Sequence, residues 1–143
     1  MYLYRGLTLS ISNHFEHLQN PAPFRNDKEI DYVPLLDILR FIGASFEWDP
    51  VDRVARISLE EGFNHTSSVS ENTVSSPYPL SNEIEEIRME IFRDSYKMML
   101  FHPLYTWKGS LFIALSDLPK MIPLRHSYNH WDDYIVLDFS STS

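Results

Sequence analysis

Residues 32–59, YVPLLDILRFIGASFEWDPVDRVARISL, decide the fold predicted for this chain. An extended run ends at Pro34, whose restricted φ and missing N–H suit the first turn of a helix. Apolar residues then follow at the spacing i, i+3, i+4 and i+7 of one helical face: Leu35, Ile38, Leu39 and Ile42. Gly43 comes next, as the residue type that most often ends helices. Because so short a helix is unstable alone in water, we expect it to pack against a sheet.

Strands are predicted on both sides of this helix. Residues 44–48 and 54–59 are separated by Asp-Pro-Val-Asp, in which Pro50 presets φ for a turn, so we expect a hairpin. Residues 1–12 alternate apolar and polar side chains, which is typical of a half-buried strand. Residues 13–28 are rich in Pro, Asn and Asp and are predicted to be a loop.

The second half of the chain is predicted to be mostly extended. Residues 83–93 fit both a helix and a strand, and we favour strands. Lys108-Gly109 suits a turn between residues 104–107 and 110–114. A last hairpin is predicted for residues 128–139 across Asp132-Asp133, and Pro119 limits any helix before it.

The pattern of residues 32–59 recurs more weakly in residues 109–139. The matched positions are Val33 with Ile113, Leu35 with Leu115, Asp37 with Asp117, Ile38 with Leu118, and Trp48-Asp49 with Trp131-Asp132. We expect the two aspartates to cap or pair at helix starts. Each tryptophan is expected to be a buried anchor of its hairpin, with ligand stacking as the alternative.

These residues resemble the copper amine oxidase N-terminal, or stalk, domain. The resemblance is carried by Val33-Pro34-Leu35, Phe41-Ile42-Gly43, Phe46-Glu47-Trp48-Asp49 and Val54-Ala55-Arg56-Ile57. It covers residues 31–59 and, less well, 109–139, where Ala114 replaces the proline. It implies a small antiparallel sheet wrapped on one helix per copy, in a non-catalytic module. The quinone and copper motifs of the oxidase core do not occur in this sequence, so the resemblance implies no copper site.

The predicted fold class is therefore α+β, an antiparallel sheet packed on a short helix and duplicated in tandem. Residues 1–60 are predicted to form the first stalk-like module and residues 81–143 a degenerate second one. The Ser/Thr-rich residues 61–80 are predicted to be the linker between them. Since each module buries only a modest core, we expect the two to dock or exchange strands, or the protein to form a homodimer.

Composition limits the function. A net charge of −8 with scattered basic residues argues against nucleic-acid binding, which requires clustered Lys and Arg. The chain has no cysteine, and it has no apolar run long enough to span a membrane. The first residues do not read as a signal peptide. We therefore expect a cytoplasmic protein as the sequence stands, or a cell-surface protein if a leader was removed.

The aromatic residues of the second half exceed what a small core needs, and some are expected to form a patch for a partner or a sugar. The predicted binding residues are Trp107, Tyr105, Phe112, Tyr128 and Arg125. The predicted function is a non-catalytic binding module that contacts a protein partner or itself, without a cofactor.

Two alternatives are kept. In the first, a pocket between copies or subunits binds a small molecule, which is anionic if Arg40, Arg53 or Arg125 converge there. In the second, a metal or an active site uses His126, His130 and Asp132, because histidines four apart on a helix can share a metal. The residues between these histidines favour a surface loop instead. The glutamates of residues 83–90 are interpreted as a solvated face rather than as acid–base groups.

Overall fold

The computed structural model describes residues 1–11, 14–19, 22–49, 53–58 and 83–139, without the side chain of Trp48. In the first half, the elements are β1 (Tyr2–Leu3), β2 (Gly6–Ile11), β3 (His14–Leu18), β4 (Phe24–Arg25), β5 (Asp31–Pro34), α1 (Leu35–Ile42), β6 (Ser45–Asp49) and β7 (Val54–Ser58). In the second half, they are β8 (Glu85–Ile87), β9 (Glu90–Arg93), β10 (Tyr96–Lys97), β11 (Leu104–Trp107), β12 (Ser110–Ala114), the 3₁₀ helix η2 (Leu118–Lys120), β13 (Arg125–Asn129) and β14 (Tyr134–Asp138).

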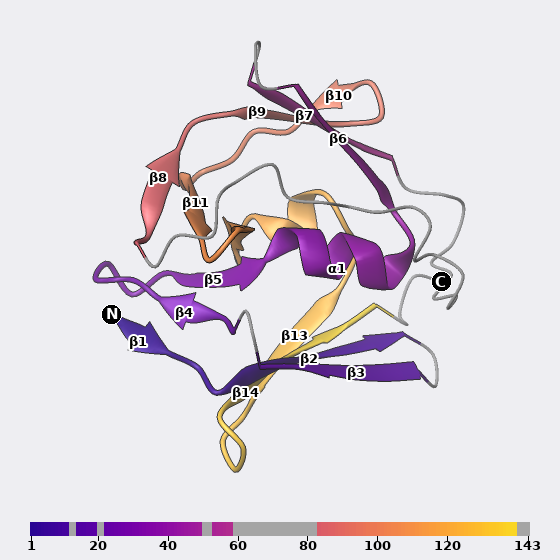
Figure 1. Cartoon of the computed structure of the whole chain (residues 1–143). Coiled ribbons are helices and arrows are strands. Elements are labelled where there is room, and N and C mark those ends of the chain that lie inside the picture. The colour runs from indigo at the N-terminus through magenta and orange to yellow at the C-terminus, as the bar shows by residue number, and fades with distance from the viewer. Residues whose placement is uncertain (12–13, 20–21, 50–52, 59–82, 140–143) are drawn as a thin grey trace.

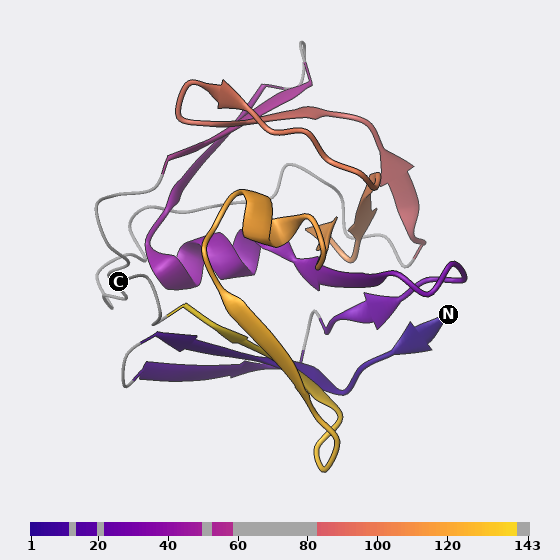
Figure 2. The same ribbon diagram turned by 180° about the vertical axis from the view of Figure 1, so that it is seen from behind.

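Helix α1 is confirmed with its predicted bounds. It starts directly after Pro34 and ends at Gly43, which has a φ of 78° and donates its N–H to the carbonyl of Arg40. A positive φ is accessible to glycine without the clash that a Cβ would cause. The predicted apolar face is buried. In Figures 1 and 2, α1 lies in the middle of the molecule, between two sheets.

The strands form three sheets. The six-stranded sheet has the order β1-β4-β5-β12-β11-β8, and the two four-stranded sheets have the orders β10-β9-β7-β6 and β13-β14-β2-β3. The four-stranded sheets lie above and below α1 in Figure 1, and strands of the six-stranded sheet close one end of the space between them. The predicted hairpins β6–β7, β11–β12 and β13–β14 are all present.

The pairing scheme of the first half returns in the second, but the two halves are interleaved. Strands β2 and β3 of the first half extend the β13–β14 hairpin, with β2 parallel to β14. In the same way, β9 and β10 of the second half extend the β6–β7 hairpin, with β9 parallel to β7. At the middle of the six-stranded sheet β5 pairs with β12, and the matched residues Val33 and Ile113 are direct partners. Each sheet therefore needs strands from both halves.

The predicted α+β class, with a helix in each of two tandem modules, is wrong. The described residues are mostly strand and contain α1 as their single α-helix. At the place of the second helix, Pro119 lies inside η2 and cannot donate the N–H that an α-helix interior requires. A glycine to end a longer helix is also missing there. The predicted linker, residues 61–80, lies outside the described residues.

Three further expectations were tested by the structure. Residues 13–28 were predicted to be a loop but contain the strands β3 and β4. Both strands are short and largely exposed, so their sequences show little of the alternation of apolar and polar residues that predicts a strand. Trp131 is not a buried anchor, because it lies in the β13–β14 turn and is 95% exposed. The two aspartates near the starts of the helices do form ion pairs. Oδ1 of Asp37 lies 3.4 Å from Nη1 of Arg40, and Oδ1 of Asp117 lies 2.9 Å from Nζ of Lys120.

The main core fills the space around α1 and contains buried residues of all three sheets. A second cluster is almost entirely aromatic and consists of Phe24, Tyr32, Trp107, Phe112 and Ala114, with Tyr105 packed against it. Both clusters draw on both halves of the chain. Among the described residues, none of the helices has the length and apolar character needed to cross a membrane.

Candidate functional site

A cleft of about 660 Å³ opens where the six-stranded sheet meets the sheet below α1. One wall comes from the N-terminal segment and the β4–β5 hairpin, and the other comes from β13. We call it the tyrosine cleft. Its lining residues are Tyr2, Tyr4, Arg25, Asp31, Leu115, His126, Ser127, Tyr128 and Ile135. The cleft thus joins segments far apart in the sequence, and neither half of the chain forms it alone.

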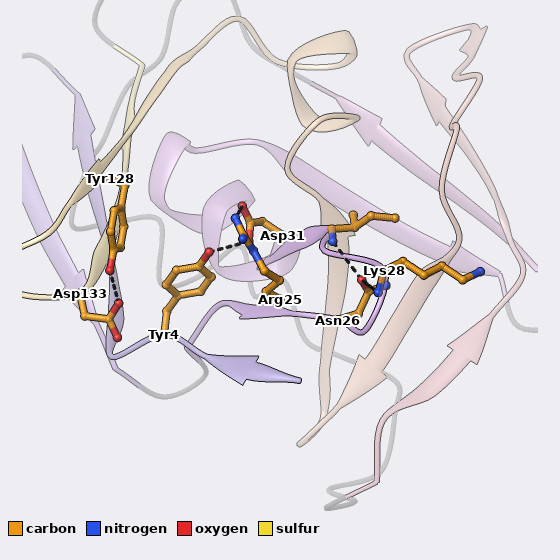
Figure 3. A network of polar contacts seen from close by, with 8 residues as sticks. Tyr4, Arg25, Asn26, Lys28, Asp31, Tyr128 and Asp133 are labelled. Carbon is orange, nitrogen blue, oxygen red and sulfur yellow. Dashed lines mark hydrogen bonds and ion pairs between the residues drawn. The ribbon is translucent and has the colours of Figure 1, made fainter.

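The first wall is built on the β4–β5 hairpin. Arg25 and Asp31 are direct partners in its register. The guanidinium of Arg25 donates to both carboxylate oxygens of Asp31, with Nε–Oδ1 at 2.9 Å and Nη2–Oδ2 at 3.3 Å. The hydroxyl of Tyr4 donates to the same Oδ1 at 2.6 Å, as Figure 3 shows. These contacts fix all three side chains, because a two-point arginine–carboxylate pair restricts both partners.

The turn between these strands holds the pair in register. The side-chain carbonyl of Asn26 accepts the backbone N–H groups of Lys28 and Ile30, each at 3.0 Å. Glu29 has a φ of 63°, a conformation that non-glycine residues adopt mainly in tight turns. This Asn-centred turn lies at the right of Figure 3. It keeps Arg25 opposite Asp31 without help from a ligand.

The second wall is fixed by Asp133, the last residue of the loop between β13 and β14. Its carboxylate accepts the hydroxyl of Tyr128 and, at 2.7 Å, the hydroxyl of Tyr2. It also accepts the backbone N–H of Arg5 at 3.2 Å. Asp133 has a φ of 60°, so its backbone is held in a conformation that a β-branched residue would resist. One carboxylate therefore ties the N-terminal segment to the β13–β14 turn.

The tyrosine rings contact one another in sequence. The ring centroids of Tyr2 and Tyr4 are 5.0 Å apart, and those of Tyr4 and Tyr128 are 5.8 Å apart. The imidazole of His130 continues the row, 4.6 Å from Tyr128. All three contacts are edge-to-face, which is a favourable arrangement for aromatic rings. Tyr4 is buried at the base of the cleft, whereas Tyr2 and Tyr128 are nearly half exposed.

Each resolved shift in and beside the cleft moves the pKa of the group further from pH 7. Burial, followed by the hydrogen bond to Asp31, raises the pKa of Tyr4. The hydrogen bond to Asp133 raises the pKa of Tyr128 to about 12. Burial would raise the pKa of Asp133, but its hydrogen bonds from Tyr128, Tyr2 and Arg5 lower it overall. Hydrogen bonding and attraction to Asp31 raise the pKa of Arg25. Each of these groups therefore keeps one protonation state across the physiological range.

The predicted binding residues are not brought together. Tyr128 lines the tyrosine cleft, and Arg125 is exposed at the start of the same strand, outside the cleft lining. Trp107 and Phe112 are buried in the aromatic cluster, and Tyr105 packs against them. Trp107, Phe112 and Tyr105 therefore pack within the six-stranded sheet and do not form the exposed patch that was predicted.

The arginines and histidines of the alternatives are also separated. Arg40 is on α1 and Arg53 is at the β6–β7 turn, so neither lines the cleft. His126 does line it, and His130 lies beyond the end of β13. Within the described residues, no three side chains of His, Asp, Glu or Cys are grouped so that they could hold a metal ion.

Seven cleft residues were not predicted as site residues from the sequence: Tyr2, Tyr4, Arg25, Asp31, Leu115, Ser127 and Ile135. The two tyrosines are two positions apart in an extended segment, so their side chains lie on one face, and this was the available signal. Arg25 lies in a stretch interpreted as loop. Only the hairpin register brings it to Asp31.

Two other hollows are present among the described residues. A groove of about 500 Å³ runs between residues 86–90 and 97–104 and contains three methionines. A depression of about 490 Å³ lies against side chains of sheet β13-β14-β2-β3, among them Phe15, His17 and Tyr134. The tyrosine cleft is larger than either, and its polar side chains are mutually fixed.

Comparison of the chain with protein-family models, with curated proteins and with solved structures found no match. The resemblance to the stalk domain stays a prediction.

Proposed function

We propose that this protein is a non-catalytic binding protein, and that the tyrosine cleft is where it binds a small molecule. The observation that carries this proposal is the fixed geometry of the cleft. The cluster of Tyr4, Asp31 and Arg25 fixes the first wall, and the hydrogen bonds to Asp133 fix the second. All of these contacts are made by the protein itself. Sites that are ordered before binding lose less conformational entropy when a ligand arrives.

The pKa shifts favour binding over catalysis. A general acid or base works best when its pKa lies near the working pH. The shifts of Tyr4, Tyr128 and Asp133 move these groups further from neutrality. Their hydroxyls and carboxylates serve as fixed donors and acceptors, which is the chemistry of recognition.

The test is a fragment library screened by NMR with isotope-labelled protein. We expect hits to shift the amide signals of residues 2–5 and 126–128, which belong to both walls. Tyr128→Ala should weaken these hits at least tenfold, because it removes an exposed ring and a partner of Asp133. The matched control is Tyr96→Ala, which removes a 75% exposed tyrosine from β10. Hits that cluster elsewhere, with none at the cleft, would contradict the proposal.

A second candidate function is contact with a protein partner or with another copy of the chain. The observation that favours it is a pair of exposed apolar side chains, Met99 and Phe101, which line the groove of about 500 Å³ and are 72% and 79% exposed. Side chains of this type are enriched at protein interfaces. Sedimentation equilibrium over a range of concentrations tests self-association, and Met99→Glu with Phe101→Glu should restore the monomer mass. A mass that stays monomeric at every concentration would exclude the homodimer.

A further inference from the structure

The charge of the tyrosine cleft restricts what it can bind, provided that the cleft is a ligand site as proposed above. Of the Asp, Glu, Lys and Arg residues, its described lining contains only Arg25 and Asp31, which neutralise each other. An anionic ligand would compete with Asp31 for the guanidinium, and the protein as a whole carries a charge of −8. A cation would meet Arg25, and the carboxylate of Asp133 at the second wall already accepts the hydroxyls of Tyr2 and Tyr128 and the backbone N–H of Arg5. The cleft therefore favours an uncharged ligand.

The polar groups of the cleft both donate and accept hydrogen bonds. A guanidinium has five N–H donors, and Asp31 accepts two from Arg25. The phenol oxygens of Tyr2, Tyr4 and Tyr128 donate to carboxylates and retain lone pairs that can accept. Ser127 and His126 add further groups on the second wall. A ligand with many hydroxyls matches this mixture, because each hydroxyl is itself both donor and acceptor.

The row of rings gives the cleft a direction. It runs from Tyr2 and Tyr4 through Tyr128 to His130, with successive centroids 5.0, 5.8 and 4.6 Å apart. Tyr4 is buried, so Tyr2 and Tyr128 are the tyrosines of the row that a ligand in the cleft can reach. Aromatic faces also suit the C–H groups on the flat side of a pyranose ring. Tyr2 and Tyr128 thus offer two partly exposed rings to a sugar chain.

Trp131 follows His130, the last ring of this row, in the β13–β14 turn. Its indole is 95% exposed, which is unusual for a side chain whose burial is so favourable. The turn that carries it is nevertheless fixed: Asn129 accepts the backbone N–H of Trp131 through its side chain and that of Asp133 through its carbonyl. A rigid turn that presents a bare indole is a common feature of binding surfaces.

We infer that the ligand of the tyrosine cleft is a neutral oligosaccharide, which runs along β13 from the Arg25–Asp31 pair to Trp131. Tyr2 and Tyr128 contact its rings, Arg25 and Asp31 bind the hydroxyls at one end, and Trp131 stacks on a sugar at the other end. A single sugar fills only the part between the walls.

The experiment titrates the protein with cello-, chito- and malto-oligosaccharides, each from the single sugar to the hexamer, followed by NMR and calorimetry. Oligogalacturonate and choline are the anionic and cationic probes. We expect one neutral series to shift cleft residues and to bind more tightly as the chain grows. Trp131→Ala should weaken the longest member by roughly tenfold, the order expected for one stacked ring, and leave the single sugar unchanged. Tyr96→Ala should change neither.

Each other outcome overturns a stated part. If only a charged probe binds at the cleft, the sugar class is wrong and the proposed binding function stands. If the neutral series binds but Trp131→Ala weakens no member, the extended path along β13 is wrong. If these probes and the fragment library all fail to shift cleft residues, the proposed function is wrong as well. Because Trp131 is almost fully exposed, its substitution tests binding without loss of the fold.

Discussion

The two halves of the chain follow the same strand pairings and differ most in the segment after the central strand. In the first half, β5 continues into α1, which begins after Pro34 and ends at Gly43. In the second, β12 continues into a turn and the single 3₁₀ turn of η2. Both segments are nevertheless buried, since Leu118, Met121 and Ile122 are as fully enclosed as the apolar face of α1. The apolar pattern thus sets burial in both halves, while the positions of proline and glycine set the local conformation.

The two hairpin turns also differ in the residues that the structure describes. The β13–β14 turn of the second half carries Trp131 and is tied by Asp133 to the N-terminal segment. The corresponding β6–β7 turn has Arg53 at its end, with a φ of 55° like that of Asp133. Of the hollows described, the tyrosine cleft lies beside the β13–β14 turn.

The largest effect is expected when the halves are separated. Residues 1–70 and 71–143, expressed as two chains, should each lack a cooperative unfolding transition, because every sheet would lose strands. Mixing the two should restore the circular dichroism spectrum of the intact protein. If either half folds alone, the interleaved arrangement is not required for stability and the tandem interpretation regains support.

A smaller effect is expected from matched truncations in the two segments. Leu39→Ala in α1 and Leu118→Ala in η2 each remove a fully buried side chain, and each should lower the free energy of unfolding by about 2–5 kcal/mol. Urea denaturation measures both. Equal losses would show that η2 serves the core as α1 does, whereas a loss at Leu118 below about 1 kcal/mol would show that it does not.

The two matched aspartates should differ. Asp117 is fully buried and accepts the backbone N–H groups of Phe101 and His102, so Asp117→Ala should cost roughly 1–3 kcal/mol for each donor left unpaired. Asp37→Ala should change stability by less than about 0.5 kcal/mol, because its pair with Arg40 is partly exposed and burial disfavours the charge of its carboxylate. Thermal and urea unfolding of both variants compare them directly. A larger loss at Asp37 than at Asp117 would be the opposite of this ranking.

The smallest effect is the pH dependence of the β13–β14 turn. The pKa of Tyr128 is raised to about 12 from 10.0, so its contribution to stability is complete below pH 10 and is lost as the pH rises to about 12. The pKa of Asp133 is lowered from 3.8, so its contribution holds at higher pH and is lost as the pH falls below that value.

Tyr128→Phe should remove the alkaline component of this dependence. Phenolate absorbance of the folded protein should then lack one late-titrating tyrosine, and Tyr96→Phe is the exposed control. If the component lost in Tyr128→Phe titrates near pH 10 instead of near pH 12, the role of Asp133 as the partner of Tyr128 is contradicted.

Local signals were enough to predict α1 and the hairpins. Pro34, Gly43 and the spacing of Leu35, Ile38, Leu39 and Ile42 act within a few residues of one another, and so do the turns at Pro50 and Lys108-Gly109. The match of Val33 with Ile113 could also be seen in the sequence, but the sequence did not show that the two residues pair. In a tandem repeat these residues would lie apart, and in this fold they are neighbours across two strands.

The candidate site could not be predicted from such local signals. The site residues Tyr4, Arg25, Asp31, Tyr128 and Asp133 come from segments near both ends of the sequence. Short-range patterns carry no information about which of these segments meet. Trp131 was misjudged for the same reason, since a tryptophan after a strand is ordinarily buried. Only Tyr128 was assigned to binding from the sequence and also lines the cleft.

The amino-acid sequence by itself determined the helix, the turns and the faces that are buried, because these follow from backbone restrictions and from apolar spacing over a few residues. The tertiary structure alone decided that β2 lies beside β14 and β9 beside β7, and hence that the halves are interleaved. It also decided that Tyr2 and Tyr128 share one carboxylate. The physical reason is that a strand's edge can pair with many partners, and the choice among them is made by the burial of the whole core around α1.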